Sequence, residues 1–165
     1  MSERDARMME RAMALAEQAA AMGEVPVGCV VAQGDIVVGS GHNRREIDRQ
    51  ATAHAEILAI GEACRSLRGW RLCGCDLFVT LEPCPMCAGA ILNARIDRVF
   101  FAVRDPKAGA LLSRIDLFAW GFNHRPEIVG GLMAERSSAL LTQFFSSRRA
   151  SRGPEKDNFS NNFTT

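Results

Sequence analysis

The chain has 165 residues, of which 47% are hydrophobic and 24% charged, and its formal net charge is +1. This is the composition of an ordinary globular domain with a real core, and the charge does not indicate a nucleic-acid-binding protein. No apolar run is long enough to cross a membrane, and the N-terminus lacks a signal-peptide core. We therefore expect a cytoplasmic protein with no membrane partner, in which thiols stay reduced.

The first elements predicted are a helix and a β-hairpin. Residues 4–22 place apolar side chains at helical spacing, and Gly23 ends that helix. The apolar, β-branched run 27–32 reads as a strand. The turn signal Gly34-Asp35 then leads into a second strand over 36–40.

A loop and a second helix follow the hairpin. Residues 43–50 are polar and charged, which indicates a loop. Thr52 is the predicted N-cap of a helix over 53–66. This helix would carry His54 and Glu56 in its first turn.

The second half of the chain alternates between strands and helices. Strands are predicted over 76–81 and 98–103, with a helix over 84–93 between them and a loop over 105–113 after them. Residues 127–129 are expected to form a short last strand.

Gly130-Gly131 leads into a final helix that ends near Arg149. Residues 1–150 are expected to form one domain, and the polar tail 151–165 is expected to be disordered. A hairpin followed by strand–helix units predicts an α/β fold, with a mixed five-stranded sheet and helices on both faces.

His54-Ala55-Glu56 and the later pair Cys84 and Cys87 form the most informative pattern. One imidazole and two thiolates can hold Zn²⁺ and leave its fourth position to water, as in catalytic zinc sites. Cys84 and Cys87 share one face at a helix N-terminus, which favours thiolates. Glu56 is then the predicted proton shuttle. This arrangement is the known signature of zinc-dependent nucleobase deaminases.

That signature implies a reaction. Glu56 would take a proton from zinc-activated water, the hydroxide would attack an amidine-like carbon of a nucleobase, and the amine would leave as ammonia. A Cys-x-x-Cys alone also occurs in redox pairs and structural zinc sites, so the combination of motifs supports this interpretation. His42 and His124 lack partner spacing, and we interpret them as structural or RNA-facing.

The C-terminal region combines basic and aromatic residues, with Phe144 and Phe145 just before Arg148 and Arg149. Such a surface suits a phosphate backbone and unstacked bases. A solvated last helix whose phenylalanines pack on the core is the simpler reading, and composition alone favours it.

Beyond the zinc motif, the chain resembles the bacterial tRNA-specific adenosine deaminases from its first helix to about Arg149. The matching segments are Glu24-Val25-Pro26-Val27-Gly28, Gly41-His42-Asn43-Arg44, Thr52-Ala53-His54-Ala55-Glu56, Val79-Thr80-Leu81-Glu82-Pro83-Cys84, Met86-Cys87-Ala88-Gly89-Ala90, Arg104-Asp105-Pro106-Lys107-Ala108-Gly109, Asn123-His124-Arg125 and the Phe144-Phe145 to Arg148-Arg149 end. The segment 111–122 departs from the family pattern.

The resemblance implies a three-layer α/β/α cytidine-deaminase-like fold, a homodimer and one zinc ion per subunit. It implies that the substrate is the wobble adenosine in the anticodon stem-loop of an arginine tRNA, which is converted to inosine. In the family pattern, Asn43 hydrogen-bonds the nucleoside, and Pro26 and Val27 wall the base pocket. Asp105 and Lys107 match a loop beside the anticodon.

At the C-terminal end, Phe145 matches a position near the flipped nucleotide, with core packing as an equal alternative. Arg148 and Arg149 would contact RNA phosphates.

Two other functions compete with deamination of a tRNA. A small-molecule deaminase would act on free bases with the same zinc core, and a non-catalytic zinc-stabilised RNA-binding module would have no use for Glu56.

Overall fold

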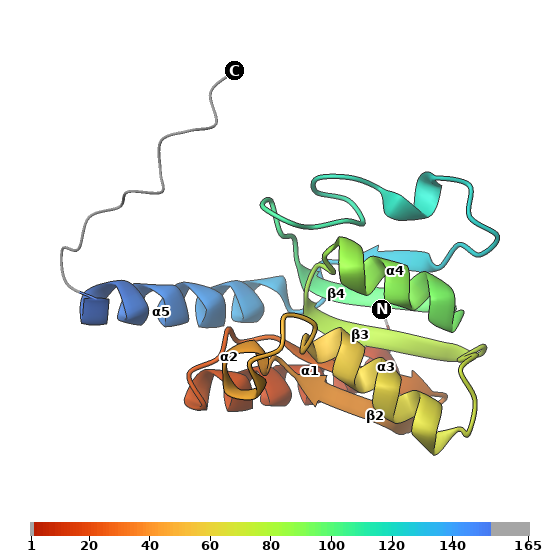
Figure 1. Ribbon diagram of the computed structural model, residues 1–165, viewed down its shortest axis with the longest axis horizontal. Coiled ribbons are helices and arrows are strands. Elements are labelled where there is room, and N and C mark those ends of the chain that lie inside the picture. Colours follow the sequence, from red (N-terminus) through yellow and green to blue (C-terminus); the bar gives the residue numbers. More distant parts are fainter. Residues whose placement is uncertain (1, 153–165) are drawn as a thin grey trace.

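The computed structural model describes residues 2–152. Its centre is a five-stranded sheet in the order β2-β1-β3-β4-β5 (Figure 1), formed by β1 (Gly28–Gln33), β2 (Ile36–His42), β3 (Cys75–Leu81), β4 (Arg98–Val103) and β5 (Glu127–Gly130). Strand β1 is antiparallel to both of its neighbours, whereas β3, β4 and β5 are parallel. The predicted mixed sheet is confirmed.

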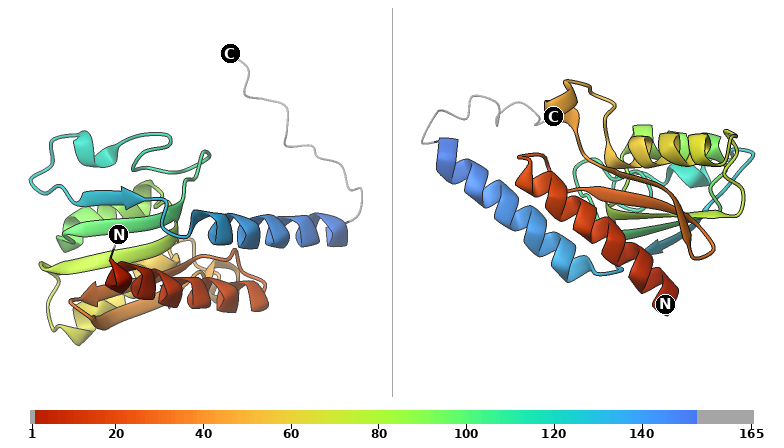
Figure 2. Two further views of the ribbon diagram at one scale, coloured as in Figure 1. Left: turned by 180° about the vertical axis from the view of Figure 1, so that it is seen from behind. Right: turned by 90° about the horizontal axis from the view of Figure 1, so that it is seen from below.

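Helices cover both faces of the sheet, as Figure 2 shows from two sides. The helices α1 (Glu3–Ala21) and α5 (Ala134–Arg152) lie on one face, and α3 (Ala55–Ser66) and α4 (Pro85–Ala94) lie on the other. The predicted three-layer α/β/α architecture is therefore confirmed.

Two short elements were not predicted: the helix α2 (Arg45–Asp48), within the expected loop 43–50, and the 3-10 helix η1 (Leu117–Ala119). An ion pair of 2.8 Å between Arg44 and Asp48 spans the single turn of α2. The carboxylate of Glu24 accepts two of its backbone N–H groups. A helix this short depends on such tertiary contacts, so its local sequence reads as a loop.

Both faces of the central strands are apolar, and the alternation of side chains along each strand divides them between two cores. In β3, Leu77 and Val79 pack with residues of α3 and α4, whereas Phe78 packs with α1. Phe78 stacks on Phe100 of β4, with 4.5 Å between ring centroids. The sheet is thereby fixed between its two helical layers.

Strand β2 and helix α3 approach closely at two glycines. A Cβ atom at Gly39 would lie 2.2 Å from the carbonyl oxygen of Ala59, and one at Gly41 would lie 2.5 Å from that of Ala55. Only glycine allows this contact. It sets the first turn of α3, and hence Glu56, against the sheet.

Helix α5 is anchored at its start and extends beyond the sheet (Figure 1). The Ser137 hydroxyl donates to the Thr80 carbonyl oxygen at 2.6 Å, and Arg136 pairs with Glu10 and Glu17 of α1. The helix ends at Arg152, three residues later than predicted. The rest of the predicted tail lies outside the described residues. Within residues 2–152, no helix combines the length and apolar character needed to span a bilayer.

Candidate active site

The starts of α3 and α4 bring the predicted metal ligands together. His54 is the N-cap residue of α3 and Cys84 that of α4, and neither side chain makes a capping hydrogen bond. The prediction of Thr52 as N-cap was wrong, because the chain first makes a tight turn, in which His54 N–H donates to the Thr52 carbonyl. Both N-cap side chains are consequently available to a ligand between the two helices.

The three candidate ligands have the separations that a tetrahedral zinc ion requires. The Nδ1 atom of His54 lies 3.7 Å from Cys84 Sγ and 3.6 Å from Cys87 Sγ. Zinc bond lengths to nitrogen and sulfur at tetrahedral angles give an N···S separation of about 3.6 Å. Within residues 2–152, these residues form the one group of three or more His, Cys, Asp or Glu side chains close enough to share a metal ion. The donor set fits zinc.

The charges of the two thiols also favour a cation. With protons alone, Cys87 hydrogen-bonds to Cys84, which lowers the pKa of the Cys84 thiol to about 4 and raises the pKa of Cys87 far above its usual range. The two thiols therefore share one negative charge. A divalent cation bound to both sulfur atoms would stabilise the two thiolates at the same time.

Glu56 lies outside the ligand group but on the wall of the same pocket. Its side chain is almost fully buried, in the first turn of α3, with 4% of its surface exposed. Burial raises the pKa of its carboxyl group. A raised pKa brings the carboxyl group closer to the range in which a general base or acid works best.

The pocket at this centre has a volume of about 200 Å³. Of the residues predicted to bind substrate, it is lined by Val27, Asn43 and Asp105. Pro26 is buried but is not among the lining residues, and its neighbour Val25 takes that place. The other lining residues are Arg45, His54, Ala55, Glu56, Leu81, Glu82, Cys84 and Ala108.

Glu82, which the sequence did not single out, holds the loop that closes one side of this pocket. Its carboxylate accepts hydrogen bonds from the hydroxyl of Ser113 and from four backbone N–H groups, at distances of 2.7–3.1 Å, in Asp105, Leu111, Leu112 and Ser113. Burial opposes its ionisation, but these hydrogen bonds outweigh it and keep the pKa of Glu82 below its usual range.

We expect Glu82→Ala to lower the free energy of unfolding by about 3 kcal/mol, because one buried and three partly buried backbone N–H groups lose their acceptor. Urea denaturation followed by circular dichroism measures this loss. Glu127→Ala, at an exposed glutamate of β5, is the control and should change stability by less than about 0.5 kcal/mol. Equal stabilities of the two variants would mean that Glu82 does not hold the loop.

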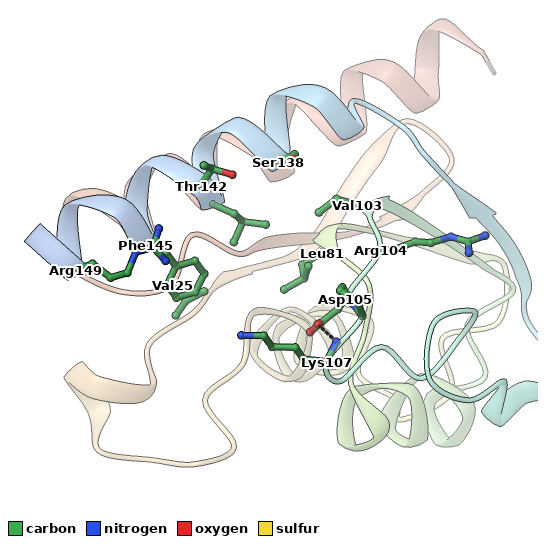
Figure 3. A pocket seen from close by; sticks show the side chains of 12 residues that line it. Val25, Leu81, Val103, Arg104, Asp105, Lys107, Ser138, Thr142, Phe145 and Arg149 are labelled. Atoms are coloured by element: carbon green, nitrogen blue, oxygen red, sulfur yellow. Dashed lines mark hydrogen bonds between the residues drawn. The ribbon is translucent and has the colours of Figure 1, made fainter. Parts of the chain in front are cut away.

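A second cavity, of about 540 Å³, adjoins the first and shares Val25, Leu81 and Asp105 with it. Figure 3 shows Phe145 and Arg149 of α5 on one side of it and Asp105 and Lys107 on the other. Arg148 does not line this cavity, and its guanidinium lies 5.4 Å from the ring centroid of Phe144. Phe144 is buried and Phe145 is 44% exposed.

The two remaining histidines make backbone contacts. His42 Nδ1 lies 3.0 Å from the carbonyl oxygen of Asn43, and His124 Nε2 lies 2.7 Å from that of Ile96. Beside His124, Asn123 accepts a hydrogen bond from Arg95 at 2.6 Å. The Asn123-His124-Arg125 motif thus ties the segment before β5 to the turn after α4.

Comparison with known proteins agrees with this geometry. The family model described as MafB19-like deaminase matches residues 3–148. A tRNA-specific adenosine deaminase of Bacillus subtilis is 40% identical over 94% of this chain and 98% of its own length. One of Agrobacterium fabrum is 44% identical over 90% and 98%.

A structure from a study of A-to-I editing by tRNA:A34 deaminases superposes with a TM-score of 0.79. It is 41% identical to this chain, and the match covers 82% of this chain and 99% of that one. The fold is therefore cytidine-deaminase-like, and the chain belongs to the family of tRNA-specific adenosine deaminases.

Proposed function

We propose that this protein hydrolytically deaminates the wobble adenosine of a tRNA anticodon loop to inosine. The observation that carries the proposal is the group of His54, Cys84 and Cys87 at a pocket that the carboxylate-bearing Glu56 also lines. The names of the relatives support tRNA as the substrate class. The choice of an arginine tRNA rests on the sequence resemblance.

His54, Cys84 and Cys87 would hold one zinc ion per subunit. Zinc bound there would lower the pKa of a water molecule and so make hydroxide available near neutral pH. Glu56 takes the proton of the attacking water and delivers it to a ring nitrogen of adenine. Water adds its oxygen to C6, the remaining proton of that hydroxyl group passes to the amine, the amine leaves as ammonia, and the ring keeps a carbonyl group. The N–H groups at the start of α4 stabilise the negative charge that develops.

Residues around the pocket would bind the nucleotide. Asn43 hydrogen-bonds the base, and Val27 lies against it, with Pro26 fixing the strand entry behind. Asp105 lines both cavities and Lys107 lines the larger one, and from this loop both would contact the RNA. Phe145 is exposed beside this loop and can stack on an unpaired base.

Arg148 and Arg149 are exposed on α5 and would bind RNA phosphates. Changing both to alanine is expected to weaken binding of an anticodon stem-loop and to reduce the slope of log K against log salt by about 1.4, or 0.7 per phosphate contact. Fluorescence anisotropy at several salt concentrations measures the slope. Arg65→Ala with Arg68→Ala, in the last turn of α3 and just after its end, is the control. An unchanged slope would show that Arg148 and Arg149 are exposed to solvent and do not contact RNA phosphates.

The deamination itself is tested with zinc-loaded protein and a short anticodon stem-loop carrying adenosine at the wobble position. Free adenosine, cytidine, cytosine and guanine are assayed beside it. We expect inosine in the stem-loop alone. Turnover of a free base or nucleoside with the RNA unchanged would make the protein a small-molecule deaminase.

We further propose that the protein is a homodimer. Large apolar side chains are exposed on the segment 111–122, including Trp120 at 68% and Phe122 at 50%, which supports an interface there. Light scattering after gel filtration should give twice the mass of one chain. The mass of a single chain would refute the dimer.

A further inference from the structure

A further buried carboxylate, Glu24, contacts the pocket-lining residue Asn43 and takes no part in the chemistry described above. It is 1% exposed. Its Oε2 accepts a hydrogen bond from the Asn43 side-chain Nδ2 at 3.0 Å. Its Oε1 accepts the backbone N–H groups of Glu46 at 2.8 Å and Ile47 at 2.9 Å. Three donors thus offset the cost of burying this charge.

The backbone of Asn43 is also held on both sides. Its N–H donates to the Val27 carbonyl oxygen at 2.9 Å, and its own carbonyl oxygen lies 3.0 Å from His42 Nδ1. The residue is 6% exposed and lines the catalytic pocket. With the backbone fixed, the remaining choice is which end of the side-chain amide faces Glu24. A half-turn of the amide exchanges its donor and its acceptor.

We propose that Glu24 is a positioning residue that sets the hydrogen-bonding polarity of the Asn43 amide toward the substrate base. An ionised carboxylate only accepts hydrogen bonds, so Asn43 must turn its NH₂ group to Glu24. The amide oxygen and the second N–H are left for the base. An adenine presents one donor and one acceptor side by side at N6 and N7, which an asparagine amide of fixed orientation can match. The inference rests on the proposed function, because it takes adenine as the ligand.

Glu24→Gln tests whether residue 24 sets the orientation of the Asn43 amide, because glutamine has almost the same shape as glutamate. The glutamine Oε1 can still accept both backbone N–H groups of α2, but its NH₂ group then faces the NH₂ group of Asn43. The Asn43 amide must turn over and present the opposite pattern. We expect kcat/KM on the stem-loop to fall about 10- to 100-fold, as for the loss of one bidentate base contact, with zinc content unchanged.

The double variant Glu24→Gln with Asn43→Asp distinguishes orientation of the residue-43 side chain toward the base from simple stabilisation of the fold. It restores the hydrogen bond with donor and acceptor exchanged and keeps one carboxylate in the pair. Thermal stability should return toward that of the unmodified protein, whereas turnover should not, because aspartate offers the base acceptors only. Recovery of turnover together with stability would overturn the inference.

An Asn43→Ala background gives a further check. If Glu24 acts through Asn43, adding Glu24→Gln to that background leaves kcat/KM unchanged, whereas fully additive losses overturn the inference. The unmodified protein is assayed on the same stem-loop. If it is inert, the proposed function falls and this inference with it. If it is active and Glu24→Gln is equally active, only this inference falls.

Discussion

Cys87→Ser is expected to abolish zinc binding and to destabilise the protein. Cys87 is fully buried in the first turn of α4, with its sulfur 3.6 Å from His54 Nδ1. A serine hydroxyl does not ionise near neutral pH, so the site loses one of its two thiolates. We expect zinc content to fall from about one ion per chain to near zero. The free energy of unfolding should fall by roughly 3 kcal/mol or more, because metal binding contributes to folding.

Elemental analysis of the purified protein and thermal unfolding with and without a chelator measure these effects. Cys75→Ser is the matched control, since Cys75 is equally buried but lies in β3 and outside the ligand group. It should keep its zinc and lose some stability. Unchanged metal content in Cys87→Ser would show that the ligand set is wrong.

The second large effect is expected for Glu56→Ala and for its isosteric counterpart Glu56→Gln. Neither variant can shuttle protons, so we expect kcat to fall about 10⁴-fold, at the upper end of what general acid–base catalysis contributes. Because Glu56 lies outside the ligand group, both variants should retain zinc. Single-turnover deamination of the stem-loop, with zinc analysis of the same samples, tests both expectations.

Glu62→Gln is the control for these variants. Glu62 is exposed on the same helix and accepts hydrogen bonds from the backbone and hydroxyl of Ser40, away from the pocket. It should leave kcat within twofold of the unmodified value, roughly the effect of a surface substitution. Substantial deamination by Glu56→Ala would contradict the role of Glu56 as the proton shuttle.

The strands and long helices followed from local patterns in the sequence. Each predicted strand lies within two residues of its observed bounds, because short apolar runs rich in β-branched residues and bounded by turn signals mark strands whatever their partners. The short elements α2 and η1 were missed. Their support comes from Glu24, about 20 residues away, and from the Asp116 side chain, which accepts the N–H of Ala119.

Only part of the candidate site could be predicted from the sequence. The motifs placed His54, Cys84 and Cys87 at two helix starts, and the fold brings those starts together. Glu24 and Glu82 were not recognised, although each lies next to an apolar segment where a buried charge is unexpected. Their hydrogen-bond partners lie 19 to 31 residues away in sequence, so only the folded chain reveals what they hold.

Glu82 holds the loop 105–113 beside the pocket, and this affects which substitutions in the loop could change substrate preference. The carboxylate binds the loop mainly through backbone N–H groups, whereas the side chains of Arg104, Pro106 and Lys107 are exposed and line the larger cavity. The course of the loop is therefore largely independent of which residues occupy those positions. Gly109 is the exception, since a Cβ there would lie 2.5 Å from the Glu82 carboxyl group. Mutational libraries at 104, 106 and 107 should thus explore new RNA partners while the catalytic scaffold stays intact.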